Sequence, residues 1–270
     1  MYRVHWATLP AVCLFLPSTA LATPRPLPFT YTTDTLDQGS AEIEQYADLT
    51  PLRAFQANAA IPVWYLGTQF QTEFEYGITD RLELGLYFTY VPTLSADAYR
   101  QQAPMTEGTG TKQRLRYVFA PPDEWPIDVG LYGELVENDH EFEFEGKVLL
   151  QRRFGKLRVD SNLWAEYELY YVNQKDLVLN PTLAATYQIT PSVHVGLESW
   201  LRVEFPNPAP HPRPYALGPV VYVGPTFLVS LGRLWWSTGV YGRVSQIDHT
   251  MQPGEPYGPV WARTIVGFDL

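Results

Sequence analysis

Glutamates recur at every second position in several stretches of this 270-residue chain. The stretch "TEFEYGITDRLELGLYFTY", residues 72–90, carries Glu73, Glu75 and Glu83 on one parity and large apolar side chains on the other. Side chains alternate across a β-strand, so two strands joined by a Gly-Ile-Thr-Asp turn would present one acidic and one apolar face. If the apolar face packs on a second sheet, the protein is a soluble sandwich or barrel. If it meets lipid, the acids line the inside of a membrane pore.

The same alternation continues along the chain. If the strands form a barrel, we predict that these charged side chains line its lumen: Glu73, Glu75, Glu83, Glu134, Arg158, Glu166, Glu168, Glu198 and Arg202. The inward parity also includes Arg114, Arg116, Glu141, Glu143, Glu145, Lys147 and Glu204. One interpretation is that these charges pair across strands and fill the lumen, because buried charges need partners. The other is a water-filled lumen whose acidic excess favours cations or neutral solutes over anions.

Catalytic chemistry has weak support in this sequence. Beyond residue 22 the histidines are His140, His194, His211 and His249. The chain has neither a G-x-S-x-G motif nor a His, Ser and Asn grouping like that of the twelve-stranded outer-membrane phospholipases. His194, near Ser192, is interpreted as a rim histidine. Residues 137–141, "ENDHE", offer either a weak cation site or ordinary turn chemistry. We therefore predict a protein that is not an enzyme and uses no cofactor or metal.

The first 22 residues resemble a secretory signal peptide. Arg3 supplies a positive region, "AVCLFL" lies in a short apolar run, and Ala20-Leu21-Ala22 is a cleavage site of small residues. A lipoprotein anchor on Cys13 is the alternative, although Val12 precedes it where a small residue is wanted. Cys13 is the only cysteine, so no disulfide can form within one chain. The formal net charge of −10 argues against nucleic acid as a partner.

Beyond the signal peptide, no run of about 18 apolar residues is long enough for a membrane-spanning helix. Instead, period-two segments follow one another with turn residues between them. We predict twelve strands, at residues 40–50, 62–76, 81–91, 111–120, 126–137, 140–153, 156–172, 178–190, 192–205, 217–230, 233–246 and 258–270. The count is even, as in bacterial outer-membrane barrels, and many segments reach the roughly 9 to 11 residues that a tilted strand needs to cross a bilayer.

The connections between these strands alternate in length, which favours a barrel over a soluble sandwich. Five joins on the predicted periplasmic side are short, whereas the opposite side carries residues 51–61, 92–110, 173–177, 206–216 and 247–257, with one tight turn at 138–139. Aromatic residues near the predicted strand ends could form interfacial girdles: Trp64, Tyr90, Tyr171 and Phe205 at one end, and Tyr76, Phe154 and Trp236 at the other. Gly224-Pro225 fits poorly and indicates either a bulge or wrong boundaries in the tenth strand.

The domain organisation follows from these segments. We predict a signal peptide at 1–22, a periplasmic lead-in at 23–38 that is too short for a plug domain, and a closed antiparallel all-β transmembrane barrel at 39–270. The last strand, "WARTIVGFDL", resembles the signal that barrel-assembly machinery recognises, although such signals usually end in Phe or Trp and this chain ends in Leu270. The expected partners are this machinery, outer-membrane lipid and lipopolysaccharide.

The stretches "YTTDTLDQGSAEIEQYADL" and "TEFEYGITDRLELGLYFTY" resemble a family of proteobacterial outer-membrane β-barrels of uncharacterised function. That family is distantly similar to barrels associated with aromatic-compound (phenol meta-pathway) degradation. The resemblance covers about the first third of the mature chain closely and the rest only in its alternation. It implies an outer-membrane barrel of a Gram-negative bacterium and transfers no catalytic residue.

Three functional hypotheses remain open at this point. The first is a porin-like passive channel or transport-type barrel for a small solute, hydrophobic or aromatic by the family resemblance. The second is a structural or surface-interaction barrel with a lumen filled by side chains, which works through its outer loops. The third is an outer-membrane hydrolase, for which the sequence offers no catalytic grouping.

Overall fold

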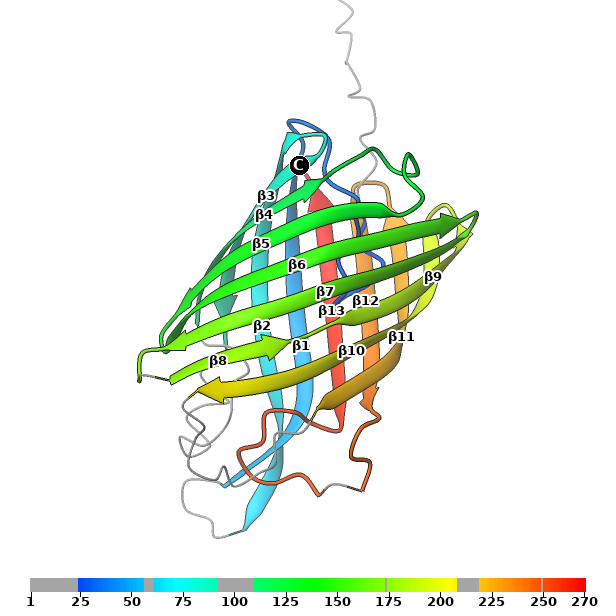
Figure 1. The fold of residues 1–270 in the computed structure, drawn as a ribbon. Coiled ribbons are helices and arrows are strands. Elements are labelled where there is room, and N and C mark those ends of the chain that lie inside the picture. Colours follow the sequence, from blue (N-terminus) through cyan, green and yellow to red (C-terminus); the bar gives the residue numbers. More distant parts are fainter. Residues whose placement is uncertain (1–23, 56–60, 92–108, 173, 208–218, 249) are drawn as a thin grey trace, which may run out of the picture.

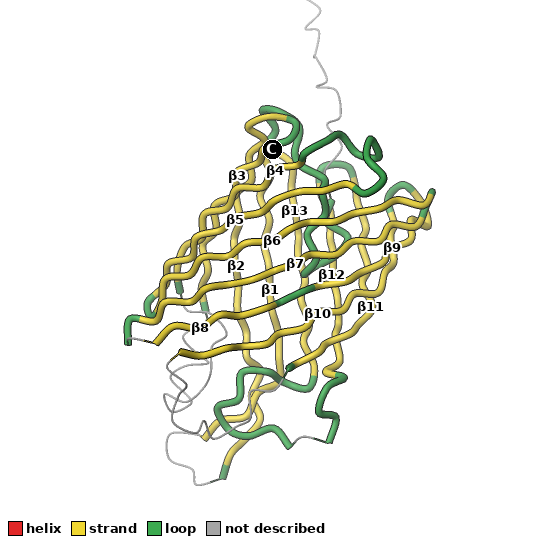
Figure 2. Tube along the Cα trace, in the orientation of Figure 1, coloured by secondary structure: helices red, strands yellow, loops and turns green. Residues whose placement is uncertain are grey.

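The computed structural model describes residues 24–55, 61–91, 109–172, 174–207, 219–248 and 250–270. The predicted signal peptide lies outside these residues. Every regular element within them is a β-strand (Figures 1 and 2), and no helix there is long and apolar enough to span a membrane. The strands are β1 Ala41–Phe55, β2 Pro62–Thr79, β3 Leu82–Tyr90, β4 Gly110–Val118, β5 Asp128–Asn138, β6 Glu141–Phe154, β7 Leu157–Tyr170, β8 Gln174–Leu179, β9 Thr182–Thr190, β10 Val193–Asn207, β11 Val220–Leu231, β12 Leu234–Arg243 and β13 Val260–Asp269.

The sheet closes on itself. β1 pairs antiparallel with β2 and also with β13, where Glu42 lies opposite Asp269 and Leu49 opposite Ala262. Both β8 and β9 lie between β7 and β10, one after the other, so the thirteen strands occupy twelve positions around the barrel. The prediction of a closed antiparallel barrel of about twelve strands is confirmed.

The predicted strand at 178–190 differs in detail from the structure. It begins earlier, at Gln174, and is interrupted at Asn180-Pro181, so the predicted loop at 173–177 is largely strand. Proline has no N–H to donate to a neighbouring strand, and its ring disfavours regular pairing, which explains the break.

The two ends of the barrel have different connections (Figure 1). At the short-turn end, residues 80–81, 155–156, 191–192 and 232–233 are tight turns, and residues 119–127 join β4 to β5. Gly155 and Gly232 have φ angles of 62° and 69°, which glycine adopts without a steric penalty. The long-loop end has the longer joins 91–109, 208–219 and 244–259, and also the tight turn 139–140.

The burial pattern is inverted relative to a soluble protein. The acids Glu73 and Glu83 are completely buried, whereas Phe74 and Phe88 are 42 % and 52 % exposed on the outer surface. The seven aromatic residues proposed for the girdles are all exposed there: Trp64, Tyr76, Tyr90, Phe154, Tyr171, Phe205 and Trp236. Water-soluble monomers rarely expose an apolar surface of this extent, and a bilayer removes the cost. The outer face is therefore the lipid-facing face.

Pro225 lies inside β11 without a bulge. Val223 pairs with Gly242 and Thr226 with Gly239, so the register of β11 against β12 is the same on both sides of Gly224-Pro225. An added Cβ at Gly224 would lie 1.9 Å from the Val240 carbonyl oxygen. The close approach of the β12 backbone therefore requires glycine at position 224. The strand continues through Gly224-Pro225 without a bulge.

The segment before β1 lies inside the barrel. Leu27 and Thr30 are completely buried, and Phe29 packs against Trp200 and Tyr241 with ring centroids 5.0 and 5.2 Å apart. In Figure 1 this dark blue segment runs behind the front strands, within the barrel. We expected residues 23–38 to form a lead-in outside the barrel. The structure instead places residues 24–36 in the lumen, because their backbone groups hydrogen-bond to lumen side chains.

Candidate functional site

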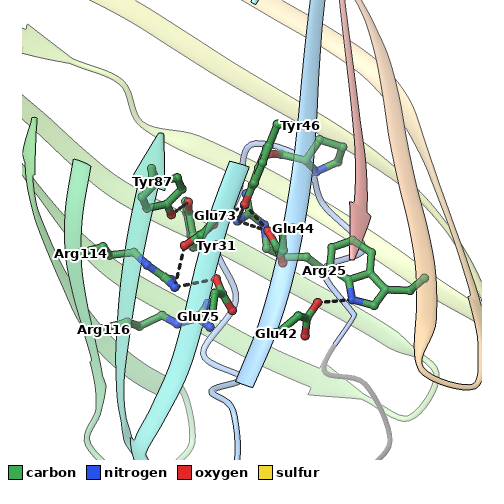
Figure 3. A network of polar contacts seen from close by, with 12 residues as sticks. Arg25, Tyr31, Glu42, Glu44, Tyr46, Glu73, Glu75, Tyr87, Arg114 and Arg116 are labelled. Atoms are coloured by element: carbon green, nitrogen blue, oxygen red, sulfur yellow. Dashed lines mark hydrogen bonds and ion pairs between the residues drawn. The ribbon is translucent and has the colours of Figure 1, made fainter. Parts of the chain in front are cut away.

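Toward the short-turn end, the lumen is packed with paired charges (Figure 3). Arg114 on β4 is completely buried, and its Nη2 lies 2.9 Å from Glu73 Oε1, 2.6 Å from Glu75 Oε1 and 2.7 Å from Glu83 Oε1. Arg116 Nη2 reaches Glu83 Oε1 at 2.6 Å. Three of the predicted lumen acids, two on β2 and one on β3, therefore share counter-charges that β4 supplies.

Arg25 extends this network from the N-terminal segment. Its Nη1 donates to the Tyr46 hydroxyl at 2.8 Å, and that hydroxyl donates to Glu73 at 2.7 Å and also contacts Glu44. Glu42 accepts a hydrogen bond from the Trp235 indole. Figure 3 shows Arg25, Glu44, Tyr46 and Glu73 close together, with Glu42 farther away. The inner half of the lumen is thus held by charge-assisted hydrogen bonds.

Lumen side chains hold the backbone of the N-terminal segment in place of a strand ladder. Glu198 accepts from the amides of Phe29 and Thr30, at 3.1 and 2.5 Å. Asn162 both accepts from and donates to the Tyr31 backbone, at 2.8 and 2.9 Å. Farther along, Thr33 N donates to Gln151 Oε1, and Leu36 N donates to Glu83 Oε2. These bonds satisfy backbone groups that would otherwise be buried without partners.

Asp34 fastens the segment near the short-turn end. Its carboxylate contacts Arg153 and lies 2.9 Å from Arg158 Nη1. Burial alone would raise the pKa of Asp34, but the two guanidinium groups hold this pKa below its ordinary value. The predicted lumen residue Arg158 therefore pairs with Asp34 and also with Asp160, whose Oδ2 lies 3.0 Å from Arg158 Nε.

A cavity of about 290 Å³ lies between this packed half and the long-loop end. We call it the outer cavity. Phe29 and Tyr31 of the N-terminal segment contribute to its lining, as do His140 of the turn 139–140 and Tyr257 of the loop 244–259. The His140 side chain is 43 % exposed, so the cavity extends to the barrel rim.

The outer cavity is acidic and aromatic. Its lining contains seven glutamates against two lysines and two arginines, together with ten aromatic residues. Arg202 forms ion pairs with several of these glutamates. Its Nη1 lies 2.8 Å from Glu166 Oε2, and its Nη2 lies 2.8 Å from Glu168 Oε1. Its Nε also lies 3.2 Å from Glu204 Oε1.

A lysine lies on aromatic faces in the same cavity wall. Lys147 Nζ is 3.8 Å from the Trp164 ring centroid, 4.0 Å from that of Tyr132 and 4.3 Å from that of Tyr31. It also pairs with Glu145 Oε1 at 2.6 Å. Ammonium groups are attracted to aromatic faces at these distances.

The residues at 137–141 form a turn. Asn138 Oδ1 accepts from the amides of His140 and Glu141 at 3.0 and 2.9 Å, and Asn138 Nδ2 donates to Glu141 Oε1. His140 Nδ1 lies 2.8 Å from Asp139 Oδ1. In the part of the chain that the structure describes, no serine hydroxyl bonds to His140 or His194. His211 and His249 lie outside that part.

The structure divides the predicted lumen residues into two groups. Glu73, Glu75, Glu83, Glu198 and Arg158 belong to the packed inner half, whereas Glu134, Glu166, Glu168 and Arg202 line the outer cavity. All nine point inward, as their parity indicated; that they act on a solute remains a prediction. Sequence reasoning missed the contribution of Phe29, Tyr31 and Tyr257, because neither segment has strand periodicity.

The fold resembles solved outer-membrane barrels. No family model matches the sequence, and no curated protein matches it. The NanC porin is 10 % identical, with a TM-score of 0.56 over 84 % of this chain and all of that chain. The "bacterial polysaccharide outer membrane secretin" is 11 % identical, with a TM-score of 0.45 over 86 % of this chain and 99 % of that one. The outer-membrane channel DcaP of Acinetobacter baumannii is 9 % identical, with a TM-score of 0.39 over 90 % and 99 %. At such identities the first likeness shows the fold alone: a closed barrel of the outer-membrane porin type.

Proposed function

We propose that this protein lies in the outer membrane of a Gram-negative bacterium and acts as a porin-like channel or transport-type barrel for a small solute. The outer cavity carries this proposal, because a polar, aromatic-lined space of about 290 Å³ inside a lipid-facing barrel has room for a small molecule. The short-turn end would face the periplasm and the long loops would face outward. Barrel-assembly machinery would insert the chain among outer-membrane lipid and lipopolysaccharide.

The lining supports a solute that is small, not anionic and apolar or aromatic in part. Seven glutamates repel anions, whereas rings such as Trp164 and Trp200 offer flat apolar contacts. The phenol meta-pathway link stays a suggestion of the sequence resemblance. We propose no catalytic activity.

The N-terminal segment would restrict passage. It lies across the lumen below the cavity and is anchored by Glu198, Asn162 and Asp34. A solute that leaves the outer cavity toward the short-turn end would have to displace this segment or pass beside it. We therefore expect small, infrequent conductance from the intact protein.

Single-channel recording in planar bilayers, with liposome swelling for neutral solutes, tests this proposal. A truncation that begins at Asp37 after the signal peptide should conduct several times more than the intact protein. Leu131→Ala, which alters a lipid-facing side chain, should conduct like the intact protein. Heat-modifiable migration on gels would show that each variant is folded.

A filled barrel that works through its outer loops is the second candidate, and the packed inner half favours it. If neither the intact nor the truncated barrel gives a current or liposome swelling, the channel proposal is refuted and this alternative is supported. If the truncated barrel does not fold, the double variant Asp34→Asn, Glu198→Gln loosens the same segment with the chain complete.

A further inference from the structure

One carboxylate in the wall of the outer cavity, that of Glu143, forms no ion pair with any residue that the structure describes. Glu143 lines the cavity and is only 7 % exposed. Among the described residues, its carboxylate has neither a hydrogen-bond nor an ion-pair partner within the barrel. Burying a carboxylate without an ion-pair partner destabilises the folded protein, which suggests a functional role for Glu143 in the cavity wall.

The strand register explains why Glu143 has no internal partner. Glu143 is on β6. It lies opposite Val136 of β5 on one side and opposite Glu168 of β7 on the other. In the adjacent row, Glu145 lies between Glu134 and Glu166. Carboxylate oxygens of Glu143, Glu145 and Glu166 all lie within 4.8 Å of one another. Like charges placed directly opposite destabilise a sheet, so this wall favours an added positive charge.

The other two acids of this group already have donors. Glu145 pairs with Lys147 at 2.6 Å, and Glu166 accepts from Asn180 Nδ2 at 2.6 Å and from Arg202 at 2.8 Å. Lys112, the lysine of β4, lies 3.6 Å from Glu134 Oε1 and also attracts the Glu143 carboxylate without forming a direct ion pair with it. Within the described part of the chain, Glu143 is therefore the member of the group without a direct hydrogen bond or ion pair, and one monovalent cation would supply that contact.

We propose that the outer cavity binds a small organic cation, with its ammonium group at Glu143 and its apolar body against the aromatic lining. Lys147 provides an internal precedent, since its ammonium group already lies between a glutamate and the rings of Trp164, Tyr132 and Tyr31. A calcium ion takes about 6 to 8 oxygen ligands, more than one unengaged carboxylate supplies. Anions are repelled by the same wall. This inference rests on the proposed function, because it names the solute class of that cavity.

The test measures binding to the full-length mature protein in nonionic detergent. ¹⁹F NMR titration would compare 4-fluorobenzylammonium with the neutral 4-fluorobenzyl alcohol and the anionic 4-fluorobenzoate. We expect the ammonium probe to bind at least about tenfold more tightly than the alcohol, and the benzoate not to bind. Glu143→Gln should weaken ammonium binding about tenfold and leave alcohol binding unchanged, whereas Glu137→Gln, on the outer face of β5, should change neither.

Equal affinity for the ammonium and alcohol probes, or unchanged ammonium binding in Glu143→Gln, would overturn the proposal. So would displacement of the ammonium probe by micromolar calcium chloride, which would indicate a metal site. Glu143→Asp, which keeps the charge, should retain part of the affinity and serves if Glu143→Gln does not fold. Because binding in detergent needs no current, a barrel that binds the probe but does not conduct would refute only the channel function.

Discussion

Glu83, in the inner half of the lumen, contacts Arg114, Arg116 and the Leu36 amide, whereas Glu143, in the outer cavity, forms no ion pair with any described residue. Both side chains are buried inward-facing glutamates on strands of the same barrel. What differs is the neighbouring strand: β4 places arginines beside Glu83, but β5 and β7 place Val136 and Glu168 beside Glu143. The same residue type can therefore hold the barrel together in one half and remain available to a ligand in the other.

The largest effect should come from removing the central cation of the inner half. Arg114→Ala would leave Glu73, Glu75 and Glu83 buried around a missing counter-charge, and breaking such a network costs about 3 to 5 kcal/mol. Urea-induced unfolding in lipid vesicles should show that loss. Arg81→Ala, in the exposed turn 80–81, is the matched control and should change stability by less than about 0.5 kcal/mol. Similar losses in both variants would contradict the distinction between the two halves.

A smaller effect is expected where the N-terminal segment is anchored. Glu198→Ala removes the acceptor of the Phe29 and Thr30 amides, and leaving buried amides unpaired costs about 1 to 3 kcal/mol. Because the strands remain paired, the segment should detach while the barrel stays folded. Limited proteolysis should then cut within residues 24–36 at least several times faster. Ser199→Ala, at the next position of β10, should leave the cleavage rate unchanged.

Acid should loosen the same segment through Asp34. The pKa of Asp34 is lower in the folded protein than in the unfolded chain. Its ion pairs therefore stabilise the folded segment at pH values above the ordinary pKa of a carboxyl group. That stabilisation is lost as the pH falls through the unfolded and then the folded pKa. Proteolysis or conductance should therefore increase below about pH 4, the usual range for aspartate. In Asp34→Asn the segment should already be loosened at pH 7. The increase in proteolysis or conductance that acid causes through Asp34 should be absent from this variant.

The smallest effects separate two glutamates within the outer cavity. Glu168→Gln weakens the interactions with Arg202 and with the Tyr170 hydroxyl and should lower stability by about 1 kcal/mol, because the Arg202 side chain is partly exposed. Glu143→Gln changes a carboxylate that forms no direct ion pair with a described residue and should leave stability unchanged or slightly higher. Urea midpoints of the two variants, measured side by side, make the comparison. A larger loss in Glu143→Gln would show that this carboxylate has an internal partner.

Much of the barrel could be predicted from the sequence. Alternation in "TEFEYGITDRLELGLYFTY" placed Glu73, Glu75 and Glu83 inside and Phe74 and Phe88 outside, as the structure has them. This works because a period of two is a local property of any half-polar strand. The break at Asn180-Pro181 was missed, although a proline within a predicted strand signals such an interruption.

The position of residues 24–36 could not be predicted in this way. Their hydrogen-bond partners, such as Glu198, Asn162 and Gln151, are more than a hundred residues away in the sequence and lie on three different strands. A segment without periodicity carries no local signal of such contacts, and a Pro- and Thr-rich composition is equally typical of an external linker.

The sequence by itself determined which side chains face lipid and which face the lumen, because successive side chains of a strand point to opposite faces. Only the closed barrel decided which lumen charges meet, since each charge takes its neighbours from the register of two other strands. That register places Arg114 among three carboxylates and leaves Glu143 beside Val136 and Glu168. Lumen side chains from distant strands also hold the N-terminal segment inside the barrel, where its Phe29 and Tyr31 line the outer cavity.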